Sequence, residues 1–301
     1  MKNASIVVLG ILLAIGGAFW YFERAHNMIP ANTYTAAPVV SNIATILATT
    51  TVQRPEQEVI GKSVQGRDIS AYHFGTGSKE ILVVSGIHGG YEWNTVLVAN
   101  DLINYLKQSP ETVPADESVT VIPILNPDGL AKVVDNSAAF TAADITASQS
   151  TQIAGRFNAN QVDLNRNFDC DWQANGVWQN TTESGGTGAF SELESRALES
   201  YITSHHITAA VVFYSSAGGV YASSCHNGVL PATQTLVRVY SNASGYPPYQ
   251  SFNFYTITGD AVNWMAKENI PAISVLLSNH TGDEWIKNKK GIEAVLAEYS
   301  Q

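Results

Sequence analysis

The chain has 301 residues, of which 14% are charged and 45% are hydrophobic, and its formal net charge at pH 7 is −10. This composition is typical of a globular protein and excludes a largely disordered one. The negative charge, without any Lys/Arg-rich stretch, excludes nucleic acid as an expected partner.

The first predicted element is an apolar run over residues 4–22, which follows Lys2. Its length is close to the ~20 residues that a helix needs to cross a bilayer. The run ends in aromatic residues followed by charges, a pattern typical of a membrane interface. We therefore expect residues 1–24 to form a membrane anchor, with the body of the chain on the extracytoplasmic side. A cleaved signal sequence, which would give a secreted protein, is the alternative, but the bulky residues after the run do not suit a small-residue cleavage site.

Residues 25–56 are rich in small residues, Thr and Pro and show no amphipathic period, so they predict a stalk or linker. Residues 57–301 predict one domain, which contains the two cysteines, Cys170 and Cys225. A compartment outside the cytoplasm permits a disulfide between them, and we predict that they are bridged. Two unrelated buried thiols are the alternative that the sequence leaves open.

The domain is predicted to be an α/β fold, because apolar runs alternate with segments of helical periodicity. Buried strands are expected at residues 79–86, 118–125, 207–216 and 270–278. Helices are expected at residues 92–108, 191–205, 259–269 and 283–299. Ser191 and Glu194 form a predicted capping box, and Asp260 is a predicted helix N-cap. The expected architecture is a mixed, largely parallel central sheet sandwiched by helices, with functional residues at the carboxyl ends of the strands.

The stretch GIHGGYEWNT places His88 and Glu92 four positions apart, directly after a predicted strand. Histidine and glutamate both ligate zinc, and a hydrolytic zinc site normally has three protein ligands and one open position for water. The two residues are therefore candidate metal ligands. Taken alone, they would equally suit a buried histidine and a glutamate that stabilises a helix N-terminus.

Several stretches in a fixed order resemble the zinc metallocarboxypeptidase family, of the carboxypeptidase A type with its bacterial γ-D-glutamyl-diaminopimelate peptidase relatives. They are IGKSVQGRDI, GIHGGYEWNT, NPDG, NANQVDLNRNFD, GTGAFSELESRAL and TGD followed by W, and VDLNRNFD is the most specific. The resemblance covers nearly all of residues 57–301. It implies a zinc carboxypeptidase-like fold, a zinc cofactor, and peptide or peptidoglycan-stem C-termini as partners. His88 and Glu92 match the first two zinc ligands, with one residue more between them than is commonest in the family.

The third zinc ligand departs from the family's pattern. The family has a histidine at the end of the strand that reads ITAAVVFYSS here, where this chain has Tyr214 and Ser215. Both are poor substitutes, because zinc prefers His, Cys and carboxylates. The sequence does not decide which of the two stands at the ligand position. His226, in the loop after the strand, is the most plausible other histidine.

The family's general base, a strand glutamate, is also absent. Leu276 stands in its place and cannot exchange a proton with water or with a leaving amine. His280 and Glu284 follow in the next loop, although we do not expect either to reach the site.

The substrate-binding residues match the family better. The resemblance assigns the peptide's terminal carboxylate to Asn165 and Arg166, since a guanidinium offers a two-pronged donor to a carboxylate. It assigns the scissile carbonyl and its developing oxyanion to Arg156. Structural salt bridges are the alternative role for both arginines.

A tyrosine that closes over the substrate corresponds to Tyr255, with Tyr246 and Tyr249 as alternatives. Asp260 matches the floor of the specificity pocket, where an acid would favour a basic terminal side chain. We therefore expect a domain that binds peptide C-termini, with zinc weakly held or absent and with hydrolysis weak or lost. A working metallocarboxypeptidase with a rearranged site and a purely structural adhesive module are the alternatives.

Overall fold

The structure, a computed structural model, describes residues 54–137 and 139–300. The anchor predicted at residues 1–24 lies outside the described residues, as does nearly all of the predicted linker. No helix in the described part of the chain is both long and apolar enough to cross a membrane.

The domain is built on an eight-stranded sheet with the order β1-β2-β4-β3-β7-β10-β8-β9. The strands are β1 Gln57–Lys62, β2 Asp68–Gly75, β3 Lys79–Val84, β4 Glu117–Ile122, β7 Ile207–Ser215, β8 Gly219–Ala222, β9 Pro248–Tyr249 and β10 Ala272–Leu277. The four central strands, β4, β3, β7 and β10, are parallel to one another. β1 and β2 at one edge pair antiparallel, and β8 pairs antiparallel with β10. The predicted mixed, largely parallel sheet is confirmed.

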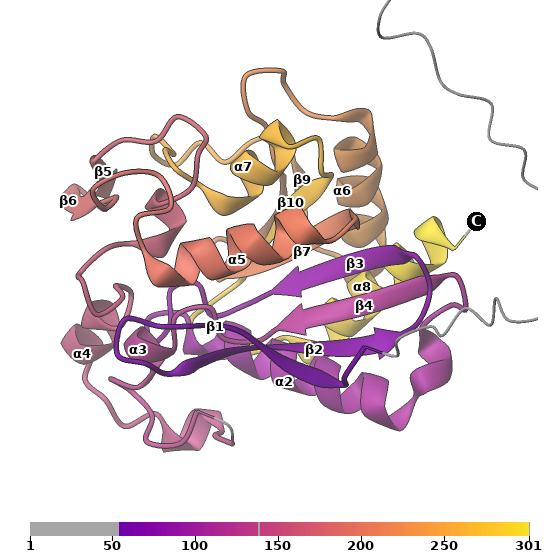
Figure 1. Ribbon diagram of the computed structural model, residues 1–301, viewed down its shortest axis with the longest axis horizontal. Coiled ribbons are helices and arrows are strands. Elements are labelled where there is room, and N and C mark those ends of the chain that lie inside the picture. The colour runs from indigo at the N-terminus through magenta and orange to yellow at the C-terminus, as the bar shows by residue number, and fades with distance from the viewer. Residues whose placement is uncertain (1–53, 138, 301) are drawn as a thin grey trace, which may run out of the picture. The chain divides into compact units, whose positions relative to one another are not determined.

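Helices cover both faces of this sheet (Figure 1). They are α2 Trp93–Gln108, α3 Pro127–Leu130, α4 Gln149–Ala154, α5 Leu193–Ser204, α6 Pro231–Ser244, α7 Ala261–Lys267 and α8 Trp285–Tyr299. α2, α6 and α8 pack on one face, and α5 and α7 pack on the other. A separate two-stranded sheet, β5 Asn175–Trp178 with β6 Thr181–Ser184, completes the fold.

The alternation of side chains along β7 determines which residues face which layer. Phe213 packs with the helices α2, α6 and α8, whereas Val212 and Tyr214 pack on the side of α5 and α7. Leu276 of β10 is the register partner of Tyr214 and lies on that same side. Because successive strand residues point to opposite faces, Tyr214 and Ser215 direct their side chains to opposite sides of β7.

The two predicted helix caps have different outcomes. Asp260 accepts a hydrogen bond from the backbone N–H of Asn263 at 2.9 Å and caps α7, as predicted. The predicted capping box at Ser191 is wrong, because α5 begins one residue later than that box requires, with Glu192 as its N-cap. The Ser191 hydroxyl is instead within 3.0 Å of the Asn167 side-chain amide, so a tertiary contact replaces the local one.

The predicted disulfide between Cys170 and Cys225 is confirmed, with the two Cα atoms 6.2 Å apart. It joins the loop before β5 to the loop after β8. At the start of the described chain, Arg54 packs against the domain although the sequence assigned it to the linker. Its guanidinium lies 3.0 Å from the buried carboxylate of Glu80.

Candidate metallopeptidase-like site

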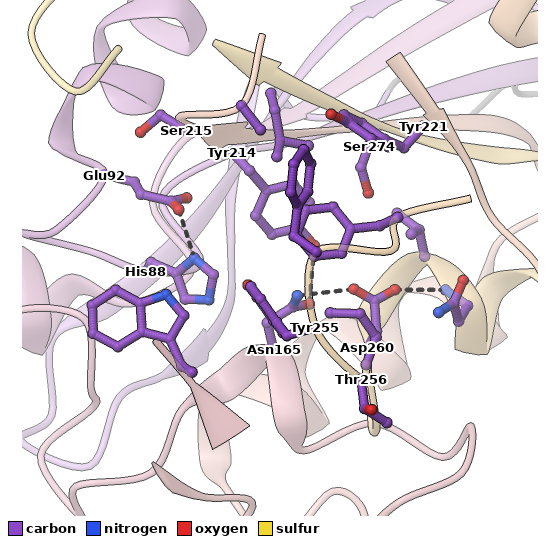
Figure 2. Close-up of a pocket in the computed structure, with 18 of the residues that line it drawn as sticks. His88, Glu92, Asn165, Tyr214, Ser215, Tyr221, Tyr255, Thr256, Asp260 and Ser274 are labelled. Atoms are coloured by element: carbon purple, nitrogen blue, oxygen red, sulfur yellow. Dashed lines mark hydrogen bonds and ion pairs between the residues drawn. The ribbon is translucent and has the colours of Figure 1, made fainter. Parts of the chain in front are cut away.

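A pocket of about 850 Å³ opens at the carboxyl ends of the central strands (Figure 2). It is lined by most of the side chains that the sequence singled out, namely His88, Glu92, Arg156, Asn165, Tyr214, Ser215, Tyr255, Asp260 and Leu276. Cys170 also lines it, so the disulfide forms part of its wall. Arg166, which was also predicted to bind substrate, does not line the pocket.

His88 and Glu92 form a buried pair at one side of the pocket. The turn after β3 carries His88, and Glu92 directly precedes α2. The Nδ1 atom of His88 lies 3.0 Å from Oε1 of Glu92, and each residue is 3% exposed. On the other side of the ring, Nε2 lies 3.2 Å from Oδ1 of Asp163. The ring is therefore held between two carboxylates.

Two atoms of this pair lack the hydrogen bonds that burial normally requires. Nδ1 of His88 has its ion pair with Oε1 of Glu92 but no bond of hydrogen-bond geometry, and Oε2 of Glu92 has no hydrogen-bond partner among the described residues. A metal-ligating histidine usually donates its other ring N–H to a carboxylate, as Asp163 is placed to accept here. The pair fits the first two ligands of a zinc ion.

The charges around His88 favour its protonated form. Burial and the nearby Arg156 cation lower the pKa of His88, but the carboxylates of Glu92 and Asp163 outweigh them and raise it to about 9. The imidazole is therefore charged at neutral pH. Because a ligating histidine must be neutral, a metal ion would have to displace a proton from this site.

Tyr214 is the first of the two residues predicted for the third-ligand position. Its ring centroid is 5.7 Å from that of His88. Its hydroxyl donates to Oδ1 of Asn165 at 2.9 Å, and burial raises the pKa of the phenol well above its usual range. A protonated, hydrogen-bonded phenol is a poor zinc ligand.

Ser215 points away from this position. Its Oγ is 3.1 Å from Oδ1 of Asn94 and 2.8 Å from Nδ1 of His280. His226 is exposed and lies 2.8 Å from Asp171, and it does not line the pocket. Among the described residues, the one group of three potential ligands whose atoms converge is Cys170, Asp171 and Cys225, and its cysteines form the disulfide.

Leu276 lies beside Tyr214 and lines the pocket, so the base position holds an apolar side chain. The structure distinguishes His280 from Glu284, the two residues of the next loop that were considered as possible replacements for the base. His280 reaches the pocket, contrary to expectation. Glu284 does not, because its carboxylate accepts hydrogen bonds from the Tyr246 hydroxyl at 2.8 Å and from the backbone at the end of β10.

The two predicted substrate arginines form a buried cluster with two acids. Arg156 lies 2.6 Å from Asp163 and 3.3 Å from Glu183, and Arg166 lies 2.8 Å from the other oxygen of Glu183. Arg156 lines the pocket, with its guanidinium 4.5 Å from the ring centroid of Trp178. The structure therefore places Arg156 at the pocket and leaves its chemical role a prediction.

Arg166 is directed into the protein. It is 2% exposed, and its remaining N–H groups donate to the backbone carbonyls of Thr256 at 3.2 Å and Val177 at 3.0 Å. These contacts, with the Glu183 ion pair, give Arg166 the structural role that the sequence left open as the alternative to substrate binding. Carboxylate binding by Arg166 stays a prediction, and it requires this arginine to exchange partners.

A chain of hydrogen bonds runs along the floor of the pocket (Figure 2). Asn165 accepts from Tyr214 and donates to Oδ2 of Asp260 at 2.9 Å. Burial raises the pKa of Asp260, and its hydrogen bonds from Asn263 and Asn165 oppose that effect. Asp260 thus both caps α7 and lines the pocket.

Of the three candidate tyrosines, Tyr255 is the one that lines the pocket. Its ring centroid lies 5.4 Å from the guanidinium of Arg166. Tyr246 is buried against Glu284, and Tyr249 stacks on Tyr221 with centroids 4.7 Å apart.

Sequence reasoning missed four residues that shape the site: Asp163, Glu183, Asn94 and Trp178. Asp163 lies within the specific stretch VDLNRNFD, so that motif could have indicated it. Glu183 and Trp178 come from the small β5–β6 sheet, which carries no recognisable motif. Their contacts with Arg156 depend on tertiary structure alone.

The family model described as zinc carboxypeptidase matches residues 43–295. A γ-D-glutamyl-L-diamino acid endopeptidase of Lysinibacillus sphaericus is 27% identical over 216 residues, which are 65% of this chain and 54% of that protein. The chain therefore spans about half the length of this curated relative.

Two solved structures share the fold. The murein-tripeptide amidase of Escherichia coli O157 has a TM-score of 0.59 at 21% identity, covering 81% of this chain and 92% of that one. The carboxypeptidase A of Helicoverpa armigera has a TM-score of 0.59 at 20% identity, covering 81% and 66%.

Proposed function

This chain belongs to the zinc carboxypeptidase family, and from this premise we propose that it binds the C-terminal ends of peptides and hydrolyses them weakly or not at all. The observation that carries the proposal is the pairing of Tyr214 with Leu276 across β7 and β10. A phenol and an alkyl group occupy the positions where the family has its third zinc ligand and its general base. The pocket around them is retained.

The retained groups support binding. Arg156 brings a buried cation to the pocket, where it can hold a carbonyl or carboxylate oxygen. Tyr255 and Trp178 provide aromatic walls. A purely structural module has no need of a pocket of about 850 Å³ with these groups directed into it.

Zinc, when bound, would be held by Nδ1 of His88 and a carboxylate oxygen of Glu92 and would polarise an oxygen of the ligand. We propose that this zinc is weakly held. Asp163 keeps the His88 ring in the orientation that ligation needs. Arg156 would share the work of holding the polarised oxygen.

Peptide stems of peptidoglycan are the ligand class that the relatives favour. The curated relative acts, by its name, on a γ-D-glutamyl-L-diamino acid bond, and the amidase from E. coli on murein tripeptide. The buried Asp260 at the pocket floor suits an amino group on the terminal side chain, as lysine or a diamino acid provides.

We place this function outside the cytoplasm, with the N-terminal segment as a membrane anchor or as a signal whose cleavage gives a secreted protein. The Cys170–Cys225 disulfide supports an oxidising compartment. The apolar run at residues 4–22 remains the basis for the anchor.

An active metallocarboxypeptidase with a rearranged site is the competing function. The buried pair of His88 and Glu92, with its unpartnered atoms, favours it. The pair would be costly to keep buried in a site that never takes up a metal.

Peptide binding and peptide hydrolysis should be measured on the same purified chain. We expect calorimetry to detect binding of tripeptides that end in lysine or diaminopimelate, and weaker binding of the C-terminally amidated forms. Release of the terminal amino acid should be slow or undetectable with zinc present. Robust, zinc-dependent release would support the active enzyme instead. Equal binding of acid and amide forms would remove the basis for C-terminus recognition.

A further inference from the structure

The loop that carries His280 is held in place by hydrogen bonds with two other segments of the chain, through the side chains of Ser215 and Asn94. Its Nδ1 lies 2.8 Å from Oγ of Ser215, the last residue of β7. Asn94, in the first turn of α2, donates its side-chain amide to the carbonyls of Asn279 at 2.8 Å and Gly282 at 2.9 Å. These bonds fix the loop on both sides of His280. Asn94 is 0% and Ser215 7% exposed.

The donors and acceptors of Asn94 and Ser215 determine which ring nitrogen of His280 carries the proton. Both N–H groups of Asn94 are used by the two carbonyls, so its oxygen is the atom that faces Ser215. The single hydroxyl proton of Ser215 donates to that oxygen at 3.1 Å. Ser215 can then only accept from His280, so Nδ1 carries the proton. In the neutral ring the other nitrogen, Nε2, has an open lone pair.

That open nitrogen has no partner among the described residues. No other described side chain or backbone group hydrogen-bonds Nε2 of His280, and the residue lines the same pocket as His88 and Glu92. The ring packs against Tyr91 with centroids 4.5 Å apart, which restricts its rotation. Burial lowers the pKa of His280, the Glu92 carboxylate opposes this, and the His88 and Arg156 cations add to it, so the ring is neutral at pH 7.

We propose that His280 is a ligand-contacting residue, whose Nε2 accepts a hydrogen bond from an N–H group of the bound peptide. The inference rests on the proposed peptide binding and assigns one contact within it. The N–H group can come from a backbone amide or from a free amino group, since both have the same donor chemistry. His280 lies on the loop after β10, whereas Asp260 precedes α7, so the two contacts would fix the ligand from different segments of the chain.

The test is a double-mutant cycle in which one N–H group of the ligand and the His280 side chain are removed singly and together, with each affinity measured by calorimetry. The probes are L-Ala-γ-D-Glu-diaminopimelate, its des-amino form, in which hydrogen replaces the amino group of the first residue, and forms methylated at one amide nitrogen. Each change removes a different N–H donor. In the unchanged protein one of these probes should bind about fivefold more weakly than its parent. In His280→Phe the same pair should bind equally, with both affinities near that of the weaker probe.

Two further variants separate this contact from a structural role. His280→Gln keeps an acceptor near the position of Nε2 and should retain most of the difference between the two probes. Ser215→Ala removes the acceptor that fixes the tautomer and should reduce that difference, so the test stands even if His280→Phe does not fold. His226→Phe, a change at an exposed histidine outside the pocket, should have no effect.

For each probe pair, the ratio of the parent's affinity to the modified form's affinity is compared between the unchanged protein and His280→Phe. If every such ratio is the same in the two proteins, the contact is overturned while peptide binding stays intact. Failure of the unchanged protein to bind any of these probes, or lysine-ended peptides, would remove the proposed function and this contact with it. Which probe is affected identifies the donor: the des-amino form indicates the free amino group, and a methylated form indicates a backbone amide.

Discussion

Tyr214 and Leu276 are register partners on the parallel strands β7 and β10, and both side chains line the pocket beside His88. They are neighbours in space although 62 positions separate them in the sequence. Two side chains that offer neither a preferred zinc ligand nor a general base thus lie side by side at the pocket, and the proposed function rests on this pair.

Restoring both groups should restore hydrolysis. Tyr214→His with Leu276→Glu supplies a third ligand and a proton acceptor, and general-base catalysis is typically worth ~100- to 10,000-fold in rate. The measurement is zinc content together with release of C-terminal amino acids from a peptide library. Neither single change should suffice, because metal and base each supply half of the mechanism.

The matched control for restoration is Ser215→His with Leu276→Glu. Ser215 faces Asn94 and His280, so a histidine there should not complete the site. Equal activity of the two double variants would show that the distinction between Tyr214 and Ser215 is misplaced. A folded, zinc-loaded Tyr214→His variant that stays inert with Leu276→Glu would point to the spacing of His88 and Glu92.

Zinc binding by the unchanged chain should be weak and should depend on His88. After dialysis we expect substoichiometric zinc by elemental analysis, and none in His88→Ala, because only two protein ligands are in place. His226→Ala removes an exposed histidine and should change nothing. One tightly held zinc per chain would mean that another residue moves in to ligate it.

Removing the shared acid of the arginine cluster should strengthen carboxylate binding. Glu183 pairs with both Arg156 and Arg166, so Glu183→Gln leaves two cations with Asp163 alone. We expect the ratio of affinities for free-acid and amidated peptides to rise by up to about tenfold, the scale of one charge-assisted hydrogen bond. Asp171→Asn, at a half-exposed acid of the pocket wall, is the control. An unchanged ratio would mean that neither arginine contacts the peptide's carboxylate.

Glu117 should make the domain less stable as pH rises. Both its carboxylate oxygens are buried without a hydrogen-bond partner among the described residues, and burial, with Asp116, raises its pKa from 4.5 to about 7. Between these two values the folded state binds more protons than the unfolded state, so the free energy of unfolding falls with increasing pH. Glu117→Gln should therefore raise the melting temperature at pH 8 by several degrees and have little effect at pH 4.

Thermal unfolding at both pH values checks this prediction. Glu111→Gln, the same change at an exposed glutamate, should be neutral at each pH. A Glu117→Gln variant that melts like the parent at pH 8 would indicate that the buried carboxyl has a partner after all.

The disulfide should contribute much of the stability of the pocket wall. Cys170 and Cys225 are 55 positions apart, and closing a loop of that length stabilises by about 4 kcal/mol in the chain-entropy model. Cys170→Ala with Cys225→Ala should lower the melting temperature by roughly 8–16 °C, measured by calorimetry. The same double variant should show no further loss when a reductant is added, whereas the parent should.

The sequence predicted the parts of the fold that depend on local pattern. The apolar runs at 207–216 and 270–278 correspond to β7 and β10, and the helical period at 92–108 corresponds to α2. His88, Glu92 and Asn165 could be located because they lie in ordered motifs that directly follow or precede such elements.

The rest depends on contacts that no local pattern encodes. The sequence could not decide whether Tyr214 or Ser215 stands at the predicted third-ligand position, because the answer depends on which of the two side chains lies beside His88. It could not show that Arg166 pairs with Glu183, because Glu183 lies on a separate small sheet. It assigned Ser191 to a helix cap that Asn167 displaces through a tertiary contact.

Arg54 ties the segment ahead of β1 to the body of the domain. Its guanidinium reaches Glu80, Thr120 and Tyr201 from a position before the first strand. A chain cut back to the start of β1 would keep every strand and helix that the structure describes yet leave the Glu80 carboxylate buried without its cation. Removal of the described residues ahead of β1 would thus weaken the fold through the loss of one ion pair, without touching a described strand or helix.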